Sequence, residues 1–153
     1  TGGQARTWKI TSEGDSFLNF TDSIQVSFML SVWWHLMDWR MAFPVSGLSR
    51  GLPSDFNKIT LKSLLKLPVG KSISYEPFAD QLIKETRFTW PSIDQTFVSN
   101  TMRSAIERMV ILPLIEFGII KSEYGMKDIG GSKFSKLSKI CLTPSGKGLL
   151  ETL

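Results

Sequence analysis

Residues 98–120, with the sequence VSNTMRSAIERMVILPLIEFGII, carry the pattern that decides the fold. Their apolar side chains recur with the 3.6-residue period of a helix that buries one face. Pro113 lacks the backbone donor of an interior helical residue, so it predicts a kink near Met109. Gly118 is a natural left-handed end for a helix. The stretch therefore predicts one long, kinked helix, whose inner face holds Val98, Met102, Ala105, Ile106, Met109, Val110 and Phe117.

The residues after this helix predict a two-stranded hairpin and a closing helix. Residues 119–124 and 138–142 are short segments rich in apolar side chains, which is typical of strands. Residues 125–137 between them hold three glycines and three lysines, which predicts a flexible, basic loop. Thr143 is expected to cap a final helix that begins at Pro144, because proline fits the first helical position.

The residues before the long helix predict two shorter helices with an extended segment between them. Apolar positions in residues 57–67 fit a short helix that carries a stripe of exposed lysines. Residues 72–74 are expected to be extended, and their last serine should cap a helix over residues 75–86. Residues 87–91 predict a turn, so the long helix should begin near Ile93.

The first 42 residues predict a strand and a helix. Residues 8–10 fit a strand that ends at Thr11, a suitable helix cap. Residues 22–39 fit both the alternation of a strand and the face of a helix. Their length of about eighteen residues favours the helix, because strands are much shorter. Residues 43–56 hold two prolines and two glycines, which predicts a linker loop.

Two kinds of local motif support these helix starts. The frame apolar-x-apolar-Thr-x-x-Gly-x-x-apolar-Leu occurs in residues 8–18 and again in residues 140–150. We expect the first copy to close a preceding module, so that the chain is a piece of a longer protein; chance similarity is the alternative. The pairs that resemble capping boxes are Asp22 with Gln25 and Ser92 with Gln95.

Helix, short strand, helix, turn, long helix and hairpin, in this order, resemble the winged-helix (winged helix-turn-helix) family from Asp55 to Leu153. The turn at 87–91 is longer than that of a tight helix-turn-helix. The resemblance implies a mainly α fold with a small β-hairpin, in which a winged-helix domain covers residues 57–153. The linker over 43–56 precedes this domain, and an N-terminal strand and helix lie within 1–42. The motifs that carry it are Leu64-Leu65-x-Leu67-Pro68-x-Gly70, Leu114-x-x-Phe117-Gly118-Ile119-Ile120 and Leu142-Thr143-Pro144-x-Gly146-x-x-Leu149-Leu150.

Winged-helix proteins that bind duplex DNA place the helix after the turn in the major groove, and the hairpin contacts the backbone. The net charge of +4 and the pI near 9.3 permit an acidic partner without requiring one. The resemblance thus implies a base-reading helix and a phosphate-binding hairpin. The candidate nucleic-acid-binding residues are Gln95, Ser99, Asn100, Arg103, Lys127, Lys133 and Lys136.

The alternative function is protein–protein interaction or oligomerisation through a winged helix. Trp33, Trp34 and Trp39 form an unusually tryptophan-rich group, and tryptophan is enriched where protein partners meet. These side chains are therefore candidate contacts for a protein partner or a second copy. The same tryptophans are also expected if residues 22–39 pack against the C-terminal domain, so both interpretations stay open.

The composition excludes most catalytic chemistry. Apolar residues make up 42% of the chain and charged residues 21%, which is ordinary for a globular protein. The chain has a single histidine, His35, which we expect to be partly buried, and a single cysteine, Cys141, which we expect to be buried. These two residues cannot complete a metal site. Residues 24–37 are too short and polar to span a membrane. We therefore expect a cytoplasmic, non-enzymatic module without cofactor, metal or membrane partner, with a nucleic-acid-binding or regulatory function.

Overall fold

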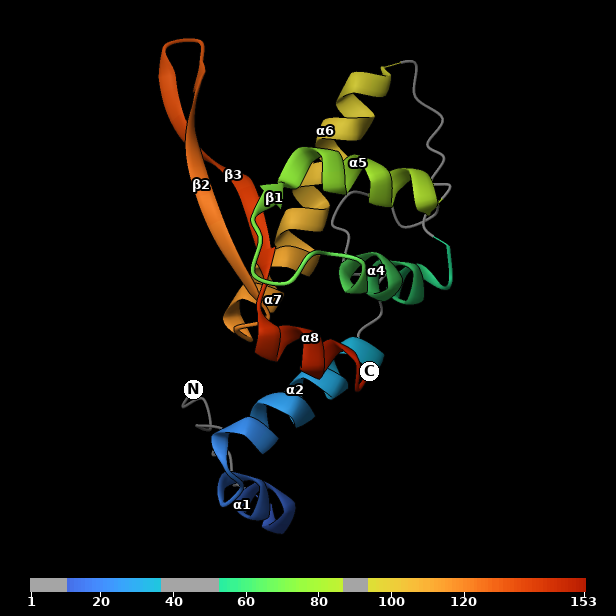
Figure 1. Cartoon of the computed structure of the whole chain (residues 1–153), viewed down its shortest axis with the longest axis vertical. Coiled ribbons are helices and arrows are strands. Elements are labelled where there is room, and N and C mark those ends of the chain that lie inside the picture. Colours follow the sequence, from blue (N-terminus) through green and yellow to red (C-terminus); the bar gives the residue numbers. More distant parts are fainter. Residues whose placement is uncertain (1–10, 37–52, 87–93) are drawn as a thin grey trace, which may run out of the picture.

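The computed structural model describes residues 11–36, 53–86 and 94–153. These residues are mainly α-helical and contain one small antiparallel sheet (Figure 1), which confirms the predicted fold class. The predicted strand at 8–10 and the turn at 87–91 lie outside the described residues. In chain order the elements are α1 (Ser12–Leu18), α2 (Asp22–Leu36), α4 (Phe56–Leu65), β1 (Ile73–Ser74), α5 (Tyr75–Glu85), α6 (Gln95–Ile106), the π-helix η1 (Glu107–Ile111), α7 (Leu112–Glu116), β2 (Ile120–Ile129), β3 (Ser132–Leu142) and α8 (Pro144–Leu150).

The three strands form an antiparallel sheet in the order β1-β3-β2. The short strand β1 pairs Ile73 with Ile140 and Ser74 with Lys139. The β2–β3 ladder is long and has one irregularity, between Glu123 and Tyr124. This sheet, with α4, α5 and α6 in the order observed, is compatible with a winged-helix topology.

The hairpin tip corrects one sequence prediction. Residues 125–137, predicted to be a flexible loop, instead continue β2 and β3 almost to the tip, where Ile129 pairs with Ser132. The turn consists only of Gly130 and Gly131, whose φ angles of 61° and 83° lie in the left-handed region that two-residue hairpin turns require. The two glycines therefore mark a tight turn, and Figure 1 shows the resulting hairpin projecting from the helices.

The long helix is interrupted where the sequence predicts a kink. Residues Glu107–Ile111 form the π-helix η1, and α7 follows with Pro113 in its first turn. Because Pro113 has no N–H to donate to the preceding turn, a wider turn accommodates its ring. Gly118 has a φ of 70°, which confirms its predicted role as the left-handed end of the helix.

Two predicted threonine caps are confirmed, whereas Ser74 occupies the N-cap position of α5 without a side-chain cap hydrogen bond. Thr11 caps α1 and Thr143 caps α8, and each side chain accepts a backbone N–H three residues later. Asp94 caps α6 by accepting from Phe97 N–H, whereas Ser92 lies outside the described residues. Gln25 was expected to form a capping box with Asp22. Its Nε2 instead donates to backbone carbonyls of residues 17, 18 and 20 and ties α2 to the end of α1.

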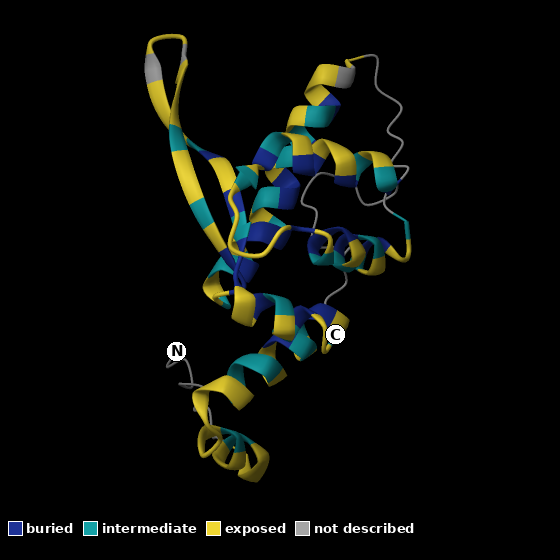
Figure 2. Ribbon diagram, in the orientation of Figure 1, coloured by how far each residue is buried: buried dark blue, intermediate teal, exposed yellow. Residues whose placement is uncertain are grey.

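One hydrophobic core joins the C-terminal elements to α2. Leu30 and Trp34 of α2 are fully buried with side chains from α4, α5, α6 and the base of the hairpin. Figure 2 shows this buried centre, and it shows that α1 and much of α2 remain exposed. Phe56, the last residue of the predicted linker, is buried at the start of α4; residues 43–52 lie outside the described part. The core thus fixes one side of α2 and leaves the other side on the surface.

Candidate functional site

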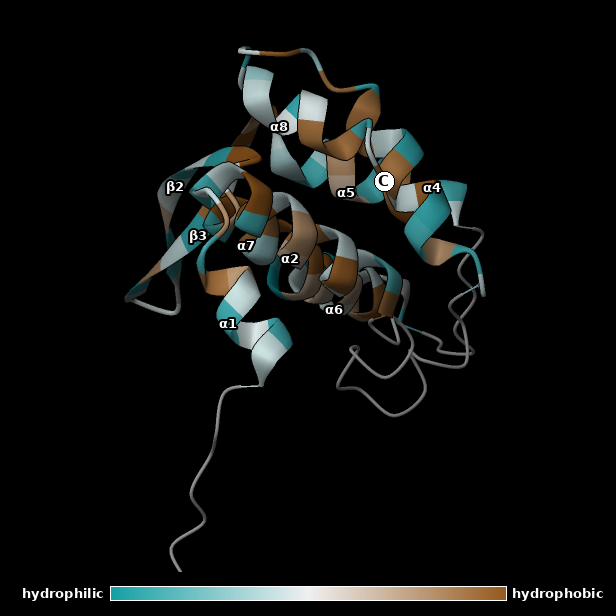
Figure 3. Cartoon of the chain, turned by 90° about the horizontal axis from the view of Figure 1, so that it is seen from below, coloured by the Kyte–Doolittle hydropathy of each residue, from teal (hydrophilic) through white to brown (hydrophobic). Residues whose placement is uncertain are grey.

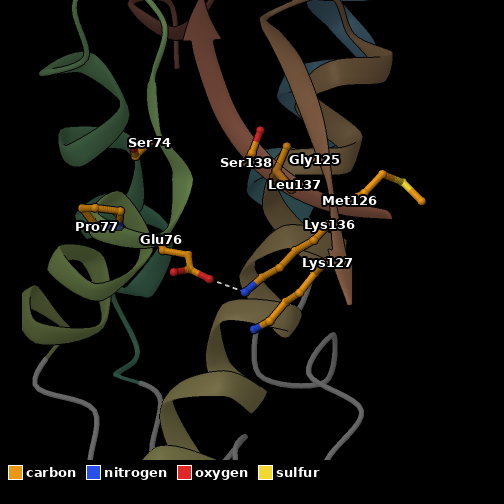
Figure 4. A pocket seen from close by; sticks show the side chains of 9 residues that line it. All are labelled: Ser74, Glu76, Pro77, Gly125, Met126, Lys127, Lys136, Leu137 and Ser138. Atoms are coloured by element: carbon orange, nitrogen blue, oxygen red, sulfur yellow. Dashed lines mark hydrogen bonds and ion pairs between the residues drawn. The ribbon is translucent and has the colours of Figure 1, made fainter. Parts of the chain in front are cut away.

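Two surfaces of the described chain are candidates for function, and the first lies between the hairpin and the helices. A groove of about 420 Å³ separates the first turn of α5 from β2 and β3. Lys127 of β2 and Lys136 of β3 line it opposite Glu76, and Figure 4 shows both lysine side chains extending towards that carboxylate. The structure therefore brings two of the predicted phosphate-binding lysines together.

One of these lysines is already neutralised. Lys136 Nζ donates to Glu76 Oε1 across the groove. This hydrogen bond lowers the pKa of the Glu76 carboxyl, so the glutamate stays ionised and retains the lysine. A phosphate contact by Lys136 would have to compete with this ion pair.

Arg103, the predicted base reader on α6, is held in the same way. Its Nε and Nη2 donate to the two carboxylate oxygens of Asp80 on α5, both at 2.7 Å. The bond to Asp80 also raises the pKa of the guanidinium. Two parallel, charge-assisted bonds of this kind are among the stronger polar contacts in proteins. Arg103 thus holds α6 against α5, and reading a base would require breaking both bonds.

The remaining predicted residues are distributed along α6 and the hairpin. Asn100 is exposed and Ser99 is half-buried on α6, and Gln95 is the first residue of that helix. Lys133 is exposed near the hairpin tip and lies opposite Asp128 in the ladder. Within the described part of the chain, no ion pair involves Lys127 or Lys133.

A second, smaller groove extends this surface towards η1. It has a volume of about 260 Å³ and is lined by Ser104, Glu107, Arg108, Lys127 and Lys136 among others. Burial raises the pKa of Glu107, although Arg108 and Lys136 act in the opposite direction. The groove therefore places three cations beside one carboxylate, that of Glu107.

Tyr75 joins α5 to α6 in this region. Its side chain is buried, and its hydroxyl donates to the backbone carbonyl of Arg103. Burial raises the pKa of Tyr75 well above its ordinary value, so the phenol remains a neutral donor. This bond ties the start of α5 to α6 and supports a structural role for Tyr75.

The second candidate surface is the outer side of α1 and α2. Its apolar side chains project from the two helices, and Figure 3, which views this end of the molecule, shows hydrophobic residues along α2. Between 38% and 77% of each residue is exposed. We call this surface the α1–α2 face, and it consists of Leu18, Phe20, Ile24, Phe28, Met29, Val32 and Leu36.

The predicted tryptophan group is divided by the structure. Trp34 is 1% exposed and belongs to the core, as the packing alternative predicts, so it cannot contact a partner. Trp33 is half-buried and its ring centroid lies 5.8 Å from that of Phe117. Trp39 lies outside the described residues. The apolar surface beside Trp33 is formed mainly by Phe28, Met29 and their neighbours.

An apolar groove of about 700 Å³ runs between the α1–α2 face and η1–α7. Phe17, Phe28, Trp33 and Phe117 contribute aromatic walls, and the rings of Phe17 and Phe28 lie 5.4 Å apart. The sequence contained a signal for this surface, because Ile24, Phe28, Val32 and Leu36 share one helical face. Periodicity identifies an apolar face but does not say what covers it.

Metal-binding and membrane-spanning features are not seen in the described ranges. No group of three or more metal-ligating side chains occurs there, and none of the helices seen there is long and apolar enough to cross a bilayer.

His35 is exposed, contrary to the expected partial burial, because it lies on the outer side of α2. Cys141 is half-buried in β3 and was expected to be buried.

Comparison with models of protein families, with curated proteins and with solved structures found no match for this chain. The function is therefore argued from the two surfaces alone. One is polar, with Arg103 and Lys136 neutralised by their own ion pairs, and the other is apolar and exposed.

Proposed function

We propose that this chain is a non-enzymatic module with a winged-helix topology that acts by protein–protein contact through the α1–α2 face. The observation that supports this function is the exposure of seven large apolar side chains on two adjacent helices and the turn that joins them. The largest apolar patch on a protein surface often marks an interaction site.

The size of the α1–α2 face also fits a protein partner. Seven side chains of about 150–200 Å² each, at roughly half exposure, present on the order of 600 Å² of apolar surface. That lies at the upper end of the largest patch on a typical monomer, about 300–600 Å². It approaches the roughly 800 Å² that each partner contributes to a stable complex.

Site-specific photo-crosslinking tests this proposal. A photoreactive amino acid replaces Phe28, at the centre of the α1–α2 face, in cells that produce the protein. The matched control replaces Lys62, which is exposed on α4. We expect protein adducts from position 28 and few from position 62. Equal labelling at both positions, or none at position 28, would contradict a role for this face.

Nucleic-acid binding is the second candidate function, and a specific observation favours it. Arg108, Lys127 and Lys133 are exposed, and no ion pair within the described part of the chain involves them. They lie on η1 and the hairpin, and Arg108 lines one pocket with Asn100 of α6 and another with Lys127. This set is small, because Arg103 and Lys136 are paired with carboxylates.

Binding to random-sequence duplex DNA across a range of salt concentrations tests this second function. Phosphate contacts predict an affinity that falls steeply with salt. Changing Lys127→Glu together with Lys133→Glu should reduce that slope by about two, since each phosphate contact contributes about 0.9. The control is the same pair of Lys→Glu substitutions at Lys58 and Lys62 on α4. No binding at low salt, or equal effects of both pairs, would exclude recognition by the hairpin.

A further inference from the structure

We propose that the α1–α2 face is covered by a second copy of this chain, with the two α2 helices packed antiparallel across a two-fold axis. This inference rests on the proposed protein-contact function and names the partner. Its support comes from the composition of α2, the geometry of its exposed residues and the placement of charge at its two ends.

The composition of α2 is that of a helix covered on all sides. Leu30 and Trp34 point into the core, while Phe28 and Val32 are exposed on the surface. No charged side chain occurs between residues 23 and 34. A helix that is apolar all round is normally buried all round, yet the described chain covers only one side of α2.

The exposed apolar residues of α2 form a single ridge. Ile24, Phe28, Val32 and Leu36 are spaced four residues apart and are 50%, 55%, 38% and 77% exposed. Rows with this spacing are the ridges that interdigitate when two helices cross at about −50°, the commonest packing class. The ridge is thus suited to contact with another helix of similar shape.

The ridge is also complementary to itself. Its centre lies between Phe28 and Val32, so a two-fold axis there places Phe28 against Val32 of the second copy and Ile24 near Leu36. Each copy then presents the same patch, as a two-fold interface requires. The groove beside the ridge, lined by Phe17, Phe28 and Trp33, can receive apolar side chains of the second copy.

Charge placement favours the antiparallel arrangement. Asp22 lies in the first turn of α2 and His35 in the last, and both are exposed. Antiparallel helices keep the two Asp22 carboxylates at opposite ends of the pair and oppose the two helix dipoles. A parallel pair would instead bring the two Asp22 carboxylates together, which is unfavourable.

The first test is the mass of the purified chain, measured by light scattering across a range of concentrations. We expect a dimer of the 17.2 kDa chain. Phe28→Glu should raise the dissociation constant by about 30-fold or more, as at an interface hot spot. Phe134→Glu on the hairpin is the matched control, because Phe134 is 53% exposed against 55% for Phe28. Circular dichroism verifies that both variants are folded.

The second test measures the orientation of the two helices. A spin label is attached to cysteine at position 23, which is exposed, in a Cys141→Ser background. Residue 23 is about seven residues from the proposed axis, so antiparallel helices place the two labelled backbones about 20 Å apart. Parallel helices would place them about 10 Å apart, and that distance would overturn the proposed arrangement.

The outcomes separate this inference from the function on which it rests. A chain that stays monomeric, or a dimer that Phe28→Glu does not weaken, overturns the second copy as partner. If the monomeric chain still gives adducts to another protein from position 28, the protein-contact function stands without the dimer. If neither a dimer nor adducts are found, both proposals are wrong.

Discussion

The helices α1 and α8 begin with the same Thr-x-x-Gly pattern and end in different environments. Thr11 accepts a hydrogen bond from Gly14 N–H at 3.2 Å, and Thr143 accepts one from Gly146 N–H at 2.9 Å. Yet no residue of α1 is buried, whereas Gly146 and Leu150 of α8 are. The repeated sequence thus specifies how a helix starts, and the rest of the chain decides whether that helix is covered.

The packing of α8 depends on Gly146. A Cβ atom at Gly146 would lie 2.4 Å from the backbone oxygen of Ile119, so only glycine allows α8 to pack there. Thr143 strengthens the same junction, because its backbone N–H donates to Ile119 O at 3.0 Å. In the described chain α1 has no such junction, and its apolar residues continue the surface of α2. This contrast supports the α1–α2 face as the place where another chain binds.

Substituting Gly146 is expected to have the largest effect. Gly146→Ala forces a methyl group against the Ile119 backbone, which cannot move without displacing the start of β2, and should cost about 3 kcal/mol of unfolding free energy. Gly148→Ala in the same helix is the control, since a Cβ there meets nothing within 4 Å. Urea unfolding measures both. Similar midpoints for the two variants would show that α8 is not packed as described.

Substituting the two capping threonines compares the two copies directly. Thr143 is buried, and its Oγ1 contacts the carbonyl oxygens of Gly118 and Ile119 at 3.0 and 3.1 Å. Thr143→Ala should therefore lower the global stability by about 2 kcal/mol. Thr11 is exposed and caps a helix without buried residues. Thr11→Ala should lower the global stability by less than about 0.5 kcal/mol. Equal losses of stability in the two variants would mean that α1 is part of the cooperative fold.

Sequence reasoning succeeded where the information is local. The threonine caps, the left-handed Gly118 and the extended segment that became β1 each depend on a few neighbouring residues. The hairpin loop was wrong because glycines and lysines do not reveal that residues 125–137 pair with each other across a two-residue turn.

The candidate sites were harder to predict because their partners are distant in the sequence. Lys136 pairs with Glu76 and Arg103 pairs with Asp80, and no local pattern connects these residues. The ridge on α2 was visible as an apolar face, but packing against the core and contact with a partner both stayed open, since burial of a face depends on the elements that pack against it.

Two ionised glutamates extend the contrast between local and distant contacts. The pKa of Glu85 is lowered to about 2, first by a hydrogen bond from Ser63 on α4 and then by Gln81 and Lys66. The pKa of Glu13 in α1 is also lowered, by its own backbone and by the neighbouring Thr11 and Ser12. Only the first of these shifts depends on tertiary structure.

Acid unfolding distinguishes these two carboxylates. Because the folded pKa of Glu85 lies below its ordinary value of 4.5, its stabilisation is complete above pH 4.5 and is lost as the pH falls towards 2. Solvent screening limits the effect to about 1 kcal/mol. Glu85→Gln and Ser63→Ala should therefore flatten the decrease in unfolding free energy between pH 4.5 and 2, measured by urea unfolding at each pH.

Glu13→Gln should leave that decrease unchanged, because the groups that lower the pKa of Glu13 are its own neighbours in the sequence. If Glu13→Gln flattened the curve as Glu85→Gln does, α1 would unfold together with the core, and the contrast between α1 and α8 would fail.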